Sequence, residues 1–451
     1  MSLFNQPETI DKLFEAEFGP AYKRSLIVHS VELPAYRFVD LYNAAETFVA
    51  GREKSHKIET EQPAETLNQL IHSDPPKYSD RSIQRSARTS WHTGVDTQIY
   101  LPVDCFWLCP SGFPEECFLV RLSFVEYKQV SRLELACGAA TPGEQAVDRI
   151  VKHSRTHSIY RNHKLQLSYE TGKTDQFGDI EKAEILQVMF SAVEPVTDAD
   201  IVLSDEHLSV LKRNVIDVQA RRKILKANGV PTRRGVLLHG PPGTGKTFAC
   251  RYLSNKLKDV TRIYVTGASL INVGAIFSLA RLLQPSVLFL EDVDLVFAAR
   301  ESNFYSPVLG DLLDHLDGLR ANEDISVVLT TNAIDRLEIA IKDRPGRISQ
   351  CVYMGPPNAS LRRRYLEHHL GDRNTEQLDF ELLVEISDGA TQAFLKEWIH
   401  RSVQIACERL DDEGKKADLR NADFETALSE MSSFLEGSDG RIIGFVGLRS
   451  R

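Results

Sequence analysis

A glycine-rich stretch in the middle of the chain has the residue types and spacing that bind a phosphate chain. Residues 240–247 are Gly-Pro-Pro-Gly-Thr-Gly-Lys-Thr, and they directly follow the apolar residues 236–238. Backbone N–H groups of such a turn, at the start of a helix, converge on phosphate oxygens. We expect Lys246 to reach the β- and γ-phosphates and the Thr247 hydroxyl to bind Mg²⁺. The expected contacts to Mg-ATP in this segment are Gly240, Pro241, Pro242, Gly243, Thr244, Gly245, Lys246, Thr247 and Phe248.

A pair of acids follows a second apolar run. Glu291 and Asp292 come directly after the apolar residues 287–290. Carboxylates at the carboxyl end of a buried parallel strand lie where ligands bind in such sheets. We expect Glu291 and Thr247 to hold Mg²⁺, and Asp292 to orient the attacking water. A helix cap is the alternative use of one acid, but it leaves the second acid unexplained. Asn332, at the end of a later strand-like run, is expected to touch the γ-phosphate and the attacking water.

Two arginines follow beyond that last run. Arg344 and Arg347 lie past its loop, from which they cannot easily reach the phosphates of their own subunit. An arginine inserted into a neighbouring subunit's site stabilises the charge of the transition state. We therefore predict that both act in trans, with a surface ion pair as the alternative.

The elements that position these residues alternate along the second half of the chain. Strand-like runs at 235–240, 262–267, 286–292 and 325–332 are separated by helical stretches. Strands that alternate with helices predict a parallel, three-layer α/β sheet. After residue 354 the apolar positions recur at helical spacing. This pattern predicts a small helical lid behind the nucleotide domain.

The first half of the chain has a different character. Residues 1–50 have helical spacing of apolar positions, and residues 51–94 are polar, which predicts a linker or mobile surface arm. We interpret Arg81, Arg85 and Arg88 there as a solvated face.

Residues 97–190 are rich in strand-forming types, with a short helix predicted at 143–153. The predicted fold class is therefore an α/β P-loop parallel sheet with a C-terminal helical lid, preceded by an α+β domain. The predicted domains are a helical segment and polar linker (1–95), an α+β domain (96–195), the P-loop domain (196–355) and the lid with its tail (356–451).

Composition limits the other possibilities. The net charge of −9 argues against a general nucleic-acid coat, since phosphate binding favours basic surfaces. The N-terminus has acids where a signal peptide needs positive charge, and no apolar run is long enough to cross a bilayer, so we expect a cytoplasmic protein without a membrane span. Cys105, Cys109, Cys117 and Cys137 have loose spacing and apolar neighbours, which predicts reduced cysteines in or near strands instead of a zinc site.

Taken together and in this order, the motifs resemble those of the AAA ATPases of the AAA+ superfamily, over about residues 200–428. The resemblance implies ATP and Mg²⁺ as ligands, a homo-oligomeric ring that is usually hexameric, and chaperone-like work on a protein client. It places Lys246 and Thr247 in Walker A, Glu291 and Asp292 in Walker B, Asn332 at sensor 1, and Arg344 and Arg347 at the arginine fingers. It places the stretch Asp200-Ile201-Val202 and the turn Gln392-Ala393 where the family contacts adenine and ribose.

The chain also departs from the pattern of the family. The acids are Glu then Asp instead of Asp then Glu, which shortens the side chain expected to activate water. The sequences of the Walker B and sensor 1 motifs are similar to those of the mitochondrial translocase of the Rieske protein and of bacterial single-ring AAA proteins. Residues 267–274 lack the aromatic residue of many AAA pore loops, and Gln392 replaces the usual glycine of the lid turn.

Two hypotheses about the work done by ATP follow. The first is a ring-shaped protein remodeller or translocase that recruits its client through the N-terminal domain. The alternative is an ATP-gated oligomeric switch or scaffold with slow turnover. The acidic balance disfavours a third hypothesis, remodelling of nucleic acid.

Overall fold

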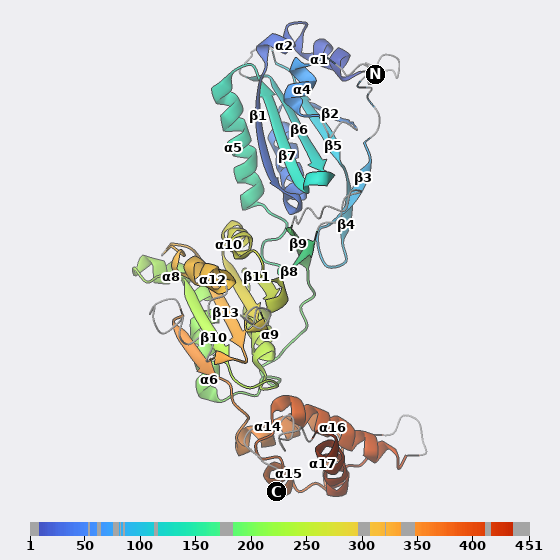
Figure 1. Cartoon of the computed structure of the whole chain (residues 1–451), viewed down its shortest axis with the longest axis vertical. Helices are drawn as coiled ribbons and strands as arrows, with labels where there is room; N and C mark the ends of the chain where they lie inside the picture. The colour runs from blue at the N-terminus through green and yellow to red at the C-terminus, as the bar shows by residue number, and fades with distance from the viewer. Residues whose placement is uncertain are drawn as a thin grey trace. The chain divides into compact units, whose positions relative to one another are not determined.

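The computed structural model describes most of the chain, which divides into two compact units, Met1–Ser191 and Ala192–Arg451. The described residues are 9–52, 55–60, 65–74, 81, 83, 86–111, 116–171, 184–295, 307–320, 322–334, 348–410 and 416–435. Figure 1 labels many of the elements of both units. No described helix is long and apolar enough to cross a membrane.

The first unit is built on a five-stranded antiparallel sheet with the strand order β1-β7-β6-β5-β2. These strands are β1 (Ile27–Pro34), β2 (His56–Glu59), β5 (Asp104–Cys109), β6 (Phe118–Val125) and β7 (Val130–Cys137). Two further antiparallel pairs are β3 (Arg88–His92) with β4 (Gln98–Pro102) and β8 (Lys164–Thr171) with β9 (Glu184–Phe190). The helices are α1 (Ile10–Phe18), α2 (Tyr22–Ser25), α3 (Phe38–Ala50), α4 (Leu67–His72) and α5 (Ala140–Thr156).

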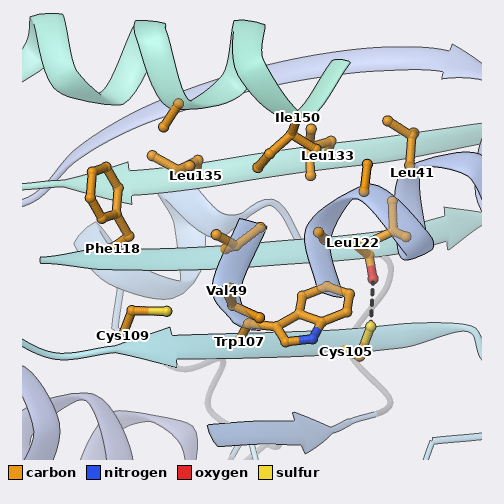
Figure 2. Packing of buried hydrophobic residues seen from close by; sticks show 14 of the residues in the cluster. Leu41, Val49, Cys105, Trp107, Cys109, Phe118, Leu122, Leu133, Leu135 and Ile150 are labelled. Atoms are coloured by element: carbon orange, nitrogen blue, oxygen red, sulfur yellow. Dashed lines mark hydrogen bonds between the residues drawn. The ribbon is translucent and has the colours of Figure 1, made fainter. Parts of the chain in front are cut away.

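Helices cover both faces of this sheet because alternate strand residues are apolar on each side. On one face Trp107, Leu122 and Leu133 pack with Leu41 of α3 and Ile150 of α5, as Figure 2 shows. On the other face the remaining strand residues join α1, α2 and α4 in a second core. The predicted strands and the predicted helix of this region are therefore present.

Two expectations for the first 95 residues are wrong. Residues 27–34, expected to be helical, form strand β1, which pairs with β7 along its whole length. Strand β2 lies in the expected linker and pairs with β5. The expected boundary at residue 95 therefore divides a single sheet. Partners distant in sequence decided these strands, and local spacing does not reveal them.

Arg81 also differs from its prediction as part of a solvated face. Its side chain is fully buried, and its Nη1 donates to the carbonyl oxygens of Leu70 at 3.1 Å and Ser73 at 2.9 Å. These acceptors lie at the end of α4, where carbonyl groups lack helical partners. The other two arginines of that set have different positions: Arg88 is exposed on β3, and Arg85 lies outside the described residues.

The cysteines of the first unit lie in or next to strands, as predicted. Cys105 and Cys109 are on β5, Cys117 precedes β6, and Cys137 ends β7. All four are buried. Burial raises the pKa of the Cys109 thiol to about 11, so it carries little thiolate at neutral pH.

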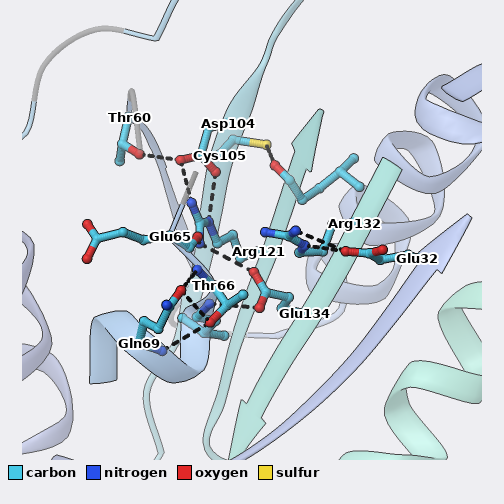
Figure 3. A network of polar contacts seen from close by, with 12 residues as sticks. Glu32, Thr60, Glu65, Thr66, Gln69, Asp104, Cys105, Arg121, Arg132 and Glu134 are labelled. Carbon is cyan, nitrogen blue, oxygen red and sulfur yellow. Dashed lines mark hydrogen bonds and ion pairs between the residues drawn. The ribbon is translucent and has the colours of Figure 1, made fainter. Parts of the chain in front are cut away.

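A buried ion-pair network joins three strands to the start of α4 (Figure 3). Arg121 is fully buried and pairs with Asp104 through two bonds, Nε–Oδ1 at 2.9 Å and Nη2–Oδ2 at 3.0 Å. Its Nη1 lies 3.3 Å from Glu134 Oε2, and Glu134 Oε1 accepts from the backbone N–H of Leu67 at 2.7 Å. Burial raises the pKa of Glu134, and the guanidinium of Arg121 opposes that rise. One guanidinium therefore holds two carboxylates on neighbouring strands.

The second unit contains the predicted parallel α/β sheet. Five strands pair in parallel in the order β14-β10-β13-β12-β11. They are β10 (Arg234–His239), β11 (Thr261–Thr266), β12 (Ser286–Glu291), β13 (Ile325–Thr331) and β14 (Gln350–Tyr353). The helical segments are α6 (Asp205–Leu211), a π-helical turn (Lys212–Asp217), α7 (Val218–Ala220), α8 (Arg222–Ala227), α9 (Lys246–Lys256), α10 (Val273–Leu282) and α12 (Pro307–Asp317).

The helical lid follows the last strand of that sheet. Its helices are α14 (Ala359–Leu370), α15 (Phe380–Ile386), α16 (Gln392–Cys407) and α17 (Asn421–Leu435). They share a core around Trp398, which Val202 also joins. The indole N–H of Trp398 donates to the carbonyl oxygen of Phe424 at 2.8 Å.

Candidate nucleotide-binding site

The glycine-rich loop joins the end of β10 to the start of α9. Gly240, Gly243 and Gly245 have φ angles of 149°, 78° and 91°, which side chains rarely adopt. A Cβ on Gly240 would also collide with the backbone oxygen of Met354. The loop conformation therefore requires these glycines, as the phosphate-binding motif predicts.

Lys246 is placed at the first position of α9 with its amine turned back over this loop. Its Nζ donates to the carbonyl oxygens of Gly240 and Pro241, both at 2.8 Å. Burial lowers the pKa of Lys246, while the nearby carboxylates of Asp292 and Asp294 raise it. A buried cation held by carbonyl oxygens above a glycine loop suits an anionic ligand.

Asp292 and Asn332, both predicted to contact the attacking water, meet at the carboxyl end of the sheet. Asp292 directly follows β12 with a φ of 51°, and its backbone N–H donates to Thr330 Oγ1 at 2.9 Å. Asn332 Nδ2 lies 3.5 Å from Asp292 Oδ1, and Asn332 N–H donates to Asp294 Oδ1 at 3.0 Å. Neighbouring parallel strands β12 and β13 thus bring together residues that are 40 positions apart in sequence.

These groups surround one cavity of about 460 Å³. Its lining residues are Asp200, Pro242, Gly243, Gly245, Lys246, Thr247, Phe248, Arg251, Asp292, Asn332, Tyr365, His369, Gln392, Ala393 and Lys396. Among the described residues the lining therefore includes Thr247, Asp292 and Asn332, whereas Glu291 is outside it. The volume is within the range of small-molecule and cofactor sites.

The lid supplies a wall of this cavity that includes residues not predicted from the sequence. Tyr365 and His369 stand one helical turn apart on α14, with rings stacked at a centroid distance of 3.9 Å. Burial raises the pKa of Tyr365 to about 12 and lowers that of His369, so both are neutral at pH 7. Their spacing of four residues on one helix face was the available signal, but it does not indicate which cavity the face lines.

The residues expected near adenine and ribose lie where the lid meets the rest of the unit. Ala393 N–H donates to the carbonyl oxygen of Gly243 at 3.0 Å. Ile201 and Val202 are each 2% exposed, and their carbonyl oxygens accept from Arg364 Nη2 and Gln392 Nε2 at 2.8 and 2.7 Å. Of this set, Asp200, Gln392 and Ala393 line the cavity.

Arg344 and Arg347 lie outside the described residues, so their action in trans stays a prediction.

Residues 236–356 match the family described as "ATPase family associated with various cellular activities (AAA)". The chain contains an AAA domain. The matched residues begin in β10 and end just after β14, so they span the glycine loop, both acids and Asn332.

The AAA domain has relatives in several well-separated organisms. The chain is 30% identical over 238 residues to a 26S proteasome regulatory subunit 8 homolog of Schizosaccharomyces pombe, which covers 49% of this chain and 57% of that protein. It is 34% identical over 201 residues to proteasome-activating nucleotidase 2 of Halobacterium salinarum, covering 41% and 48%. It is 27% identical over 261 residues to the ATP-dependent zinc metalloprotease FtsH 2 of a Thermoanaerobacter species, covering 55% and 50%. The chain thus spans about half the length of these relatives.

Proposed function

We propose that this chain hydrolyses Mg-ATP and uses the energy, in a homo-oligomeric ring, to remodel or translocate a protein client. The observation that carries the proposal is the cavity in which the glycine loop and Lys246 face Asp292 and Asn332. That arrangement offers a cradle for the phosphates and, across from it, a carboxylate and an amide for a water molecule. The ring, usually a hexamer in this family, and the N-terminal unit as the client-binding part belong to the proposal.

A hydroxyl and a carboxylate are oxygen donors of the kind that Mg²⁺ takes. Thr247 lines the cavity beside the loop, whereas Glu291 ends β12, which β13 separates from β10, and is outside the lining. We assign both to the ion, which when bound neutralises charge on the phosphates and orients them for attack. Asp292 then serves as the group that orients and accepts a proton from the attacking water. The family residues Ile201 and Val202 are assigned to adenine.

A second candidate is an ATP-gated switch or scaffold with slow turnover. It is favoured by Asp292 itself, since the side chain is one methylene shorter than the glutamate usual at this position. A shorter carboxylate leaves the water less well placed, and misplacement of about 1 Å can cost a factor of about 10² in rate.

A pair of substitutions tests the ATPase assignment. Asp292→Asn should bind ATP but lose turnover, because the amide cannot accept the proton. Lys246→Ala should lose ATP binding, because it removes the buried cation over the loop. Nucleotide binding is measured by fluorescence with a labelled ATP, and turnover by phosphate release. The matched control is Lys258→Ala, an exposed lysine just beyond α9, which should leave both unchanged.

Several outcomes would contradict these assignments. If Lys246→Ala still binds ATP with the affinity of the wild type, the assignment of residues 240–247 to phosphate binding is wrong. Normal turnover in Asp292→Asn, together with loss of turnover in Glu291→Gln, would exchange the roles of the two acids. The Asp292→Asn protein held in ATP also tests the remodelling role, because a co-purifying protein that raises the wild-type rate of ATP hydrolysis favours a remodeller. ATP-dependent assembly without such stimulation favours the switch.

A further inference from the structure

Gln392 has contacts on two sides of the nucleotide cavity. It is the first residue of α16, and its Nε2 donates to the carbonyl oxygen of Val202 at 2.7 Å. Its Oε1 lies so close over Gly245 that a Cβ on that glycine would collide with it. The side chain therefore extends from the lid across the cavity lining, between the phosphate loop and segment 201–203.

The hydrogen bond to Val202 is made in a protected place. Val202 is 2% exposed, so its carbonyl oxygen has little access to water. A buried carbonyl that loses its donor must find another, because an unsatisfied buried acceptor is costly. A ligand with a hydrogen-bond donor directed at Val202 would supply that replacement.

The lid does not depend on Gln392 alone for its attachment. Ala393 N–H donates to Gly243 O at 3.0 Å, and Arg364 Nη2 donates to Ile201 O at 2.8 Å. His368 Nε2 also lies 3.0 Å from Asp200 Oδ1. These contacts use atoms other than the Gln392 side chain, so they remain when that side chain is shortened.

We propose that the Gln392 side chain is an internal competitor of the nucleotide: it occupies the Val202 carbonyl and the space over Gly245, and the bound nucleotide must displace it. This inference rests on the proposed nucleotide site. It assigns to Gln392 control of affinity, and it explains why the side chain lies in the cavity instead of in solvent. A neutral hydrogen bond of this kind changes an equilibrium by a factor of about 5.

The test measures binding of a fluorescent ATP analogue to the full chain and to three variants. Gln392→Ala removes both the hydrogen bond and the occupied volume, so its Kd should fall by about fivefold and its association should be faster. Gln392→Met keeps the side-chain volume but has no N–H donor, so its Kd should lie between those of the wild type and Gln392→Ala. Gln404→Ala is the matched control, because Gln404 is an exposed glutamine on the same helix, and its Kd should equal that of the wild type.

The outcomes separate this inference from the proposed function. If the wild type binds the analogue and Gln392→Ala binds it equally or more weakly, the competitor role is overturned while the nucleotide site stands. If Gln404→Ala gives the same gain as Gln392→Ala, the effect belongs to the helix and the role is likewise overturned. If neither wild type nor variant binds above the level of Lys246→Ala, the proposed function fails and this inference fails with it.

Discussion

Asp40 is a carboxylate that α3 carries into the interior of the first unit. It is 1% exposed, its Oδ1 accepts from the backbone N–H of Ile159 at 2.9 Å, and its Oδ2 lies 3.3 Å from Arg37 Nε. Burial raises the pKa of Asp40 to about 6, although both contacts favour the charged form. Loss of hydration therefore outweighs the favourable contacts.

This carboxylate should make stability depend on pH. Its pKa in the unfolded chain is about 3.9, so its contribution to stability is fully present below about pH 4 and is lost as pH rises through about 6. Asp40→Asn keeps the Oδ1 acceptor and cannot ionise. Relative to wild type, its free energy of unfolding should therefore improve by about 2–3 kcal/mol between pH 4 and pH 7.

Tryptophan fluorescence during urea unfolding of the full chain measures this difference. In a Trp398→Phe background the remaining tryptophans, Trp91 and Trp107, both report on the first unit. Asp148→Asn, on the exposed face of α5, is the control. The difference between its free energy of unfolding and that of the wild type should be the same at pH 4 and pH 7. A constant difference for Asp40→Asn as well would mean that Asp40 does not titrate in this range.

Some residues of the candidate site could be predicted from the sequence, whereas others that lie near them could not. The positions of Lys246, Asp292 and Asn332 followed from short motifs, because a phosphate loop and two strand ends fix them locally. Tyr365 and His369 were not predicted as cavity residues. Their place depends on how α14 lies against the P-loop side of the unit, and the periodicity of a helix gives only which residues share a face.

At the scale of elements, local spacing predicted the parallel sheet of the second unit well, because each βαβ unit has continuous apolar strands. It failed for β1 and β2, which are short or half-exposed strands at the two edges of the sheet. Edge strands have weak apolar runs, so their pairing partners β7 and β5 decide their conformation.

The buried network around Arg121 joins β5, β6 and β7 to the start of α4. Removal of the Arg121 guanidinium from this network should be strongly destabilising. Arg121→Met leaves the carboxylates of Asp104 and Glu134 buried without their cation, which costs about 3–5 kcal/mol. Arg88→Met, which removes an ion pair with Glu59 from a half-exposed arginine, should cost only about 0–1 kcal/mol. Urea unfolding of the full chain gives both values. Similar losses for the two variants would show that burial does not set the strength of the Arg121 network.

At the scale of the whole molecule, the proposed catalysis requires a second copy of the chain. The cavity of one copy contains the phosphate loop, Asp292 and Asn332, and the predicted fingers Arg344 and Arg347 would come from its neighbour. The sequence placed both arginines by their distance from the last strand. Their contacts lie outside the described residues, so the shared site stays a prediction.

Mixing two inactive variants tests this shared site. Arg347→Ala should bind ATP and lose hydrolysis by a factor of about 10³–10⁵, as measured by phosphate release. Lys246→Ala lacks the nucleotide but keeps its arginines, so mixed rings should recover activity that neither variant has alone. Subunit exchange is verified with differently tagged copies. If subunits exchange and ATP hydrolysis does not return, the two arginines do not act in trans.

The distribution of the seven cysteines has a practical consequence. Five are buried, whereas Cys351 on β14 and Cys407 at the end of α16 are exposed. Burial also raises the pKa of Cys250 well above its ordinary value, which further suppresses its reactivity. A maleimide dye pair added to the native protein would therefore attach at two positions, one on β14 of the AAA domain and one at the end of α16 in the lid. Energy transfer between the dyes would report lid movement in real time, with no engineered residue.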